Sequence, residues 1–185
     1  AESSAPGSVE ATPIVGGTSY GSAVAISPNV DYSGVLTGTS HQKDFFYFDV
    51  NPGAIVTLTY TSAVTWTSTT YFYLDDQAHV SYLDYVGING AEQTAQQTYM
   101  GKSTTPTRYY MRAEANSSSP TAVSHYGFML EIENQHDGAQ AHDAAEIAGS
   151  ARVIAPVLGG STTYTGTIGG QDTDDWYRIS AVSGQ

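Results

Sequence analysis

The chain has 185 residues, a length that suits one ordinary domain or one domain with part of a second. Its formal net charge is −12, with 6 Lys and Arg against 18 Asp and Glu, which argues against nucleic-acid binding because that needs clustered positive charge. Cysteine is absent, so disulfides and thiolate metal sites are excluded. No apolar run approaches the ~20 residues that cross a bilayer, and we expect no membrane insertion.

The N-terminal residues 1–18 are small, polar and interrupted by proline, and we expect a flexible segment that follows a cleaved signal peptide. From residue 19 onward, short runs rich in Val, Thr, Tyr and Phe alternate with turn-forming residues. In chain order, the predicted strands are 33–37, 44–50, 54–60, 71–74, 79–85, 108–113 and 127–133. Short strands at intervals of about 8–15 residues are typical of an antiparallel β-sandwich.

The segment 44–50, with the sequence DFFYFDV, is apolar on both faces and predicts a central strand. Residues 54–60 alternate between apolar and polar side chains, as a strand with one buried face does. We therefore predict that the main core residues are Phe46, Phe48, Val56 and Leu58. Only residues 143–154 contain helix-favouring side chains, and Gly149 weakens that prediction.

An internal repeat divides the chain. Three segments of the first copy match three of the second in the same order: 22–28 (SAVAISP) with 150–156 (SARVIAP), 32–36 (YSGVL) with 164–168 (YTGTI), and 44–47 (DFFY) with 175–178 (DWYR). The first copy continues through several more predicted strands. The repeat therefore predicts a complete domain over 19–134, and a linker with a partial second copy over 135–185.

The second copy, YTGTIGGQDTDDWYRISAVSGQ, resembles the hallmark segment of bacterial and archaeal pre-peptidase C-terminal domains. The first copy is similar to it in LTGTSHQKDFFYFDVNPGAIVTLTY, and RYYMRAEANSSSPTAVSHYGFMLEIE is similar to the family's closing hairpin. The resemblance covers 19–134 in full and 135–185 in part. It implies an all-β fold, an antiparallel jelly-roll-like β-sandwich with a partial second sandwich unit. It also implies a non-catalytic domain of secreted peptidases or tandem surface proteins, which binds collagen in the collagenases.

The resemblance further implies a calcium site in the second copy. Calcium-binding members place acids in the lead-in and in the hallmark turn, and the corresponding residues are Asp137, Asp143, Asp172, Asp174 and Asp175. Such carboxylates, with carbonyl oxygens, can supply the about six to eight ligands that calcium takes. The same residues could instead form a solvated acidic turn. The first copy has His41, Gln42 and Lys43 in place of acids before Asp44, so we expect no calcium there.

The sequence contains no pattern that predicts catalysis or a nucleotide cofactor. It has no G-x-S-x-G, H-E-x-x-H or G-x-G-x-x-G motif, and Asp75 and Asp76 are adjacent on a predicted strand end, where they point to opposite faces. His136 and His142 are best interpreted as exposed loop residues. Asn116 begins a formal glycosylation sequon, which an unmodified loop fits as well. We therefore expect no enzyme activity.

Tyrosines are frequent in the middle of the chain, namely Tyr71, Tyr73, Tyr82, Tyr85, Tyr109 and Tyr110. Those that alternate outward could bind sugar or protein, since aromatic faces bind both. The others pack in the core or against neighbouring strands. We expect Tyr110 to be a core residue.

Two functions fit these observations. The first is an extracellular structural or surface protein, a filament, sheath or surface-layer subunit in which copies of the chain assemble by strand sharing. The second is a calcium-dependent accessory binding module of a secreted peptidase or other exoenzyme, which docks on extracellular protein or glycan. Both place the chain outside the cell or at its surface.

If the five acids form one site, calcium should raise the melting temperature. Binding to the folded state alone adds about 2.7 kcal/mol at a hundredfold excess of ligand over Kd. Thermal melts with calcium and with a chelator measure the difference, and Asp175→Ala should remove it. Equal melting temperatures in the two conditions would contradict the site.

Overall fold

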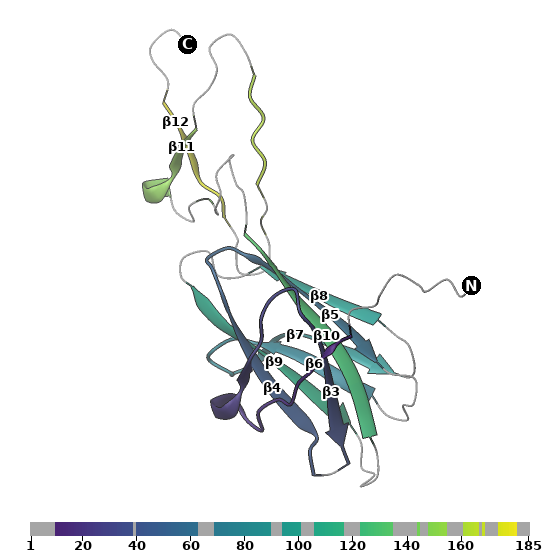
Figure 1. The fold of residues 1–185 in the computed structure, drawn as a ribbon. Coiled ribbons are helices and arrows are strands. Elements are labelled where there is room, and N and C mark those ends of the chain that lie inside the picture. The colour runs from purple at the N-terminus through teal and green to yellow at the C-terminus, as the bar shows by residue number, and fades with distance from the viewer. Residues whose placement is uncertain are drawn as a thin grey trace, which may run out of the picture. The chain divides into compact units, whose positions relative to one another are not determined.

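In this computed structural model the described residues are 10–38, 40–62, 69–89, 94–100, 106–116, 123–134, 144, 148–154, 161–166, 168 and 174–180. Their regular structure is almost entirely β (Figure 1). The strands are β1 (Thr12–Pro13), β2 (Val24–Ala25), β3 (Asp31–Thr37), β4 (Lys43–Val50), β5 (Ile55–Ser62), β6 (Thr69–Asp75), β7 (Tyr82–Asn89), β8 (Thr94–Met100), β9 (Thr107–Asn116), β10 (Val123–Glu133), β11 (Arg152–Ile154) and β12 (Tyr177–Ile179). Two short 3₁₀ turns are η1 (Tyr20–Ser22) and η3 (Ala148–Ser150). No helix among the described residues has the length and apolarity of a membrane span.

The longer strands form two five-stranded sheets, ordered β1-β3-β10-β5-β8 and β2-β4-β9-β6-β7, and β11 pairs with β12 in a separate small sheet. Strand β10 runs antiparallel to β3, and β6 runs antiparallel to both β7 and β9. The short strands β1 and β2 pair in parallel with β3 and β4. The predicted all-β fold, an antiparallel β-sandwich, is confirmed.

The chain divides into two compact units. The first comprises residues 1–48, 58–97 and 109–131, and the second comprises 49–57, 98–108 and 132–185. The sequence-based boundary near residue 134 separates the chain differently, because the ends of several long strands belong to the second unit.

The core of the first unit consists of aromatic rings that join the two sheets. The Phe46 ring of β4 lies 5.1 Å from that of Phe128 in β10, and Tyr60 of β5 stacks on Phe72 of β6 at 4.1 Å. The predicted core is confirmed, since none of Phe46, Phe48, Val56 and Leu58 is more than 2% exposed. Burial of such side chains supplies most of the stability of a sandwich.

Strand β8 was not predicted, because its sequence TAQQTYM is polar for a strand. Its Gln97 is nevertheless buried, and the Tyr60 hydroxyl donates a 2.5 Å hydrogen bond to the Gln97 amide oxygen. A strand predicted over 79–85 begins only at Tyr82. The reason is a turn in which the Asp76 carboxylate accepts the backbone N–H groups of Ala78 and His79, with His79 at φ 52°.

The described part of 143–154 is not α-helical. It consists of η3 and β11, which repeat the plan of η1 and β2. The turns close with equivalent hydrogen bonds, Ala23 N–H to Tyr20 O and Ala151 N–H to Ala148 O. The following parallel pairs are equivalent too. Val24 pairs with Phe46 in the first copy, and the corresponding Arg152 pairs with Tyr177 in the second. Residues 148–154 thus follow the same local plan as residues 20–25.

Replacing Phe46 or Phe48 by alanine should lower the free energy of unfolding by about 3–5 kcal/mol, because each change leaves a cavity in a packed core. Urea denaturation measures the loss. Val80→Ala is the control, since Val80 is 88% exposed and its truncation should cost little. A parent-like midpoint for both phenylalanine variants would contradict the assignment of this core.

Candidate functional site

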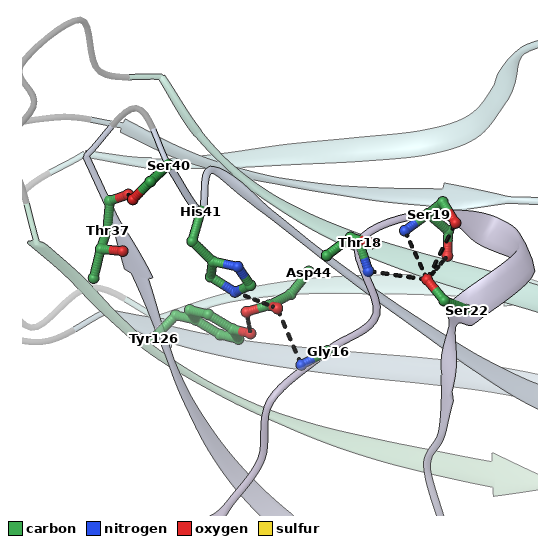
Figure 2. Close-up of polar contacts among 9 residues, drawn as sticks. All are labelled: Gly16, Thr18, Ser19, Ser22, Thr37, Ser40, His41, Asp44 and Tyr126. Atoms are coloured by element: carbon green, nitrogen blue, oxygen red, sulfur yellow. Dashed lines mark hydrogen bonds and ion pairs between the residues drawn. The ribbon is translucent and has the colours of Figure 1, made fainter.

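Asp44, which the sequence repeat aligns with Asp175, lies at the start of β4, and its carboxylate is buried (Figure 2). Asp44 is fully buried, and its Oδ1 accepts the Gly16 N–H at 3.0 Å and lies 2.9 Å from His41 Nε2. The Tyr126 hydroxyl of β10 donates to Oδ2 at 2.5 Å. Both oxygens of the Asp44 carboxylate thus have hydrogen-bonding partners within the protein. Asp44 is therefore a structural group that ties the two sheets together.

Two glycines make room for this arrangement. A Cβ on Gly16 would lie 2.6 Å from the Asp44 Cβ, and a Cβ on Gly34 would overlap the Tyr126 phenol. Burial, the charge of Asp44 and the hydrogen bond to it all raise the pKa of Tyr126 above its usual range. The phenol accordingly stays protonated and remains a donor at physiological pH.

Strand β4 lies in the sheet β2-β4-β9-β6-β7, and four tyrosines gather on the outer face of that sheet at its β6–β7 edge. We call Tyr71, Tyr73, Tyr82 and Tyr85 the tyrosine face. Alternation in β6 puts Tyr71 and Tyr73 opposite the buried Phe72 and Leu74. Tyr82 and Tyr85 of β7 are 50% and 51% exposed. Adjacent exposed aromatic rings make this surface a candidate binding site.

The rings of the tyrosine face support one another. Tyr73 is the cross-strand partner of Tyr85, and their rings lie 5.9 Å apart with planes 22° from parallel. Tyr82 meets Tyr85 edge-on at 5.2 Å and 71°. Tyr71 lies over Gly87, where a Cβ would approach its Cε1 to 3.0 Å. The exposed rings are therefore held at fixed, unequal angles by packing.

Charged side chains border the tyrosine face on β9. The Arg112 guanidinium stacks over the Tyr73 ring, 4.2 Å from its centroid. Arg112 Nε lies 3.5 Å from the Glu114 carboxylate, which also pairs with Lys43 Nζ at 3.1 Å. Burial, followed by the charge of Glu114, raises the pKa of Tyr73. The face thus combines apolar rings with hydrogen-bonding groups at its border.

The expectation that Tyr110 is a core residue is wrong. Its neighbour Tyr109 is fully buried, while Tyr110 faces outward and is half-buried beneath Tyr20 and His79, which stack on each other at 3.7 Å. The Tyr20 hydroxyl donates to the buried Asp75 at 2.7 Å. Which of two adjacent tyrosines points inward depends on strand register, which their identical side chains cannot reveal.

Of the five predicted calcium ligands, Asp137, Asp143 and Asp172 lie outside the described residues. Asp174 is exposed and Asp175 is half-buried, and both line a groove in the second unit with Tyr164, Gly166 and Tyr177. Among the described residues, no group of three or more His, Asp or Glu side chains could hold a metal ion. The calcium site stays a prediction. So does glycosylation of Asn116, whose side chain is not described.

No family model matches this chain, and no curated protein matches it significantly. Among solved structures, the pre-peptidase C-terminal domain of a Bacillus anthracis collagenase is 16% identical, with a TM-score of 0.45 over 58% of this chain and 93% of that domain. The C-terminal CBM6 of LamC, a laminarinase from Zobellia galactanivorans, is 12% identical, with a TM-score of 0.34 over 52% of this chain and 75% of that one. A CBM4 structure is 12% identical, with a TM-score of 0.33 over 54% and 78%. These scores are too low to carry an argument about function.

Replacing Tyr126 by phenylalanine should lower the free energy of unfolding at pH 7 by about 1.5–3 kcal/mol, because a buried carboxylate loses a donor. The parent should also lose stability as the pH rises above about 10. Tyr126 deprotonates there in the unfolded chain but keeps its proton in the folded protein, because folding raises its pKa, and unfolding therefore becomes more favourable. The variant should lose less over the same range. Urea titrations at pH 7 and in alkaline buffer measure both effects, with Tyr85→Phe as control. Parallel pH profiles for Tyr126→Phe and parent would contradict the assignment.

Proposed function

We propose that this chain is an extracellular, non-catalytic accessory module of the pre-peptidase C-terminal type, and that its tyrosine face binds a soluble glycan chain. The half-exposed pair Tyr82 and Tyr85, held in place by Tyr73, carries the proposal. Sugar rings present C–H groups on their faces, which pack on aromatic rings, and hydroxyls at their edges, which need hydrogen-bonding partners. Glu114 and Arg112 stand beside the rings and can serve those hydroxyls.

The ring angles favour one class of glycan. Because Tyr82 and Tyr85 are inclined at 71°, both cannot lie flat on a single planar surface such as a crystalline polysaccharide. A single chain, whose successive sugars turn relative to one another, can place one unit on each ring. The net charge of −12 disfavours an anionic polysaccharide. A neutral, soluble chain fits best.

Self-assembly, the other function predicted from the sequence, finds support in a different part of the chain. Val153, Ile168, Trp176 and Ile179 in the second copy are each between 46% and 61% exposed, which leaves apolar area available to a partner. This observation concerns the second unit and is independent of the tyrosine face.

Titration calorimetry with soluble neutral glucan oligosaccharides should show saturable binding. Tyr82→Ala and Tyr85→Ala should each weaken it on the order of tenfold, because each removes a stacking surface. Val35→Ala is the control, since Val35 is similarly exposed but lies on β3 in the other sheet. A second titration uses gelatin. Binding to gelatin but not to the oligosaccharides would indicate a protein ligand, and binding to neither titrant would refute the proposal.

A further inference from the structure

In the first unit, two aromatic side chains of β10, Tyr126 and Phe128, pack against residues that have counterparts in the second copy. We call these residues of the repeat its landmarks. Tyr126 lies over Gly34, its partner in the register of β10 with β3, and donates to Asp44. Phe128, two residues on, stacks on Tyr32 at 5.1 Å and lies 5.1 Å from Phe46. A Tyr-x-Phe pair on one strand thus completes this part of the core.

The second copy has the same landmarks. Tyr164 and Gly166 correspond to Tyr32 and Gly34, while Asp175 and Tyr177 correspond to Asp44 and Phe46. All four line one groove of about 370 Å³ within the second unit. Strand β12 pairs with β11 in the register that β4 has with β2, so the second copy repeats the local geometry of the first.

We infer that this groove is a strand-accepting site, and that its occupant is an extended segment carrying Tyr-x-Phe, the counterpart of β10. The tyrosine hydroxyl would donate to Asp175, as Tyr126 donates to Asp44. Gly166 would leave room for its ring, and the phenylalanine would pack between Tyr164 and Tyr177. The inference is independent of the glycan-binding proposal, which concerns the first unit.

Exposure of the surrounding apolar side chains supports such an occupant. Ile168, which lines the groove, is 60% exposed, whereas its counterpart Leu36 is fully buried. Ile179 is 61% exposed, whereas its counterpart Phe48 is 2% exposed. In the first copy the side chains at these positions lie in the core of the sandwich. An incoming strand would remove apolar surface from water and add main-chain hydrogen bonds, the means by which strands add to open sheets.

A synthetic peptide of residues 123–133 (VSHYGFMLEIE), which is the β10 sequence, tests the site. Labelled and titrated into the intact chain, it should bind saturably, as followed by fluorescence anisotropy. The same peptide with Tyr126→Phe should bind about tenfold or more weakly, because the hydrogen bond from the phenol to the Asp175 carboxylate would be lost. Equal affinity of the two peptides, or no binding, would overturn the inference.

Substitutions in the protein localise the binding. Gly166→Ala should weaken binding about tenfold or more, because its Cβ would enter the space for the phenol. Gly149→Ala, in the same copy, is the matched control, since a Cβ there meets no atom within 4 Å and should leave binding unchanged. Circular dichroism checks that both variants fold. Unchanged binding to Gly166→Ala would overturn the groove as the site.

The same titration identifies one source of the natural strand. If a second copy of this chain supplies the strand, sedimentation equilibrium will show that the protein self-associates. The peptide should then compete for the groove and lower the average mass of the assembly. A monomer that binds the peptide supports the site equally and indicates a donor other than a second copy. An assembly whose mass the peptide leaves unchanged, with no bound peptide, would overturn the inference.

Discussion

The buried Asp44 carboxylate is the constraint on which the first unit is built. A charge in a dry core must be paired or hydrogen-bonded on nearly all of its acceptor sites, or folding carries a large desolvation cost. Here the donors come from Gly16, between β1 and β2, and from Tyr126 of β10, 82 residues from Asp44. The hydrogen bonds therefore fix strand β4 of one sheet relative to β10 of the other. Gly16 and Gly34 follow as necessities, because any side chain there would displace the carboxylate or the phenol.

Once the inner faces are fixed, the outer face of β6 and β7 is free to serve binding. Strand alternation commits Phe72 and Leu74 to the core and so presents Tyr71 and Tyr73 to the other side. The rings of Tyr82 and Tyr85 on β7 both pack against that of Tyr73. Side chains already held by packing would lose less conformational entropy on binding, which favours the binding role proposed for this face.

The second copy shows the same plan with a different outcome. Its turn, its parallel strand pair and its landmark glycine and aspartate repeat those of the first. Ile168 and Ile179 are nonetheless exposed, whereas their counterparts Leu36 and Phe48 are buried. The two segments thus agree in local sequence and local structure and differ in the exposure of these side chains.

Local patterns in the sequence determined the sandwich, the core around Phe46 and Phe48, and the repeat, because alternation and turn residues act over a few positions. Tertiary structure decided the rest. The polar strand β8 pairs with β5, where Tyr60 provides a partner for its buried Gln97. Tyr110 faces outward because pairing sets the register of β9. The Asp44–Tyr126 hydrogen bond joins residues 82 positions apart in the chain. The spacing of the two residues in the sequence does not predict this contact, which arises only when whole strands pair.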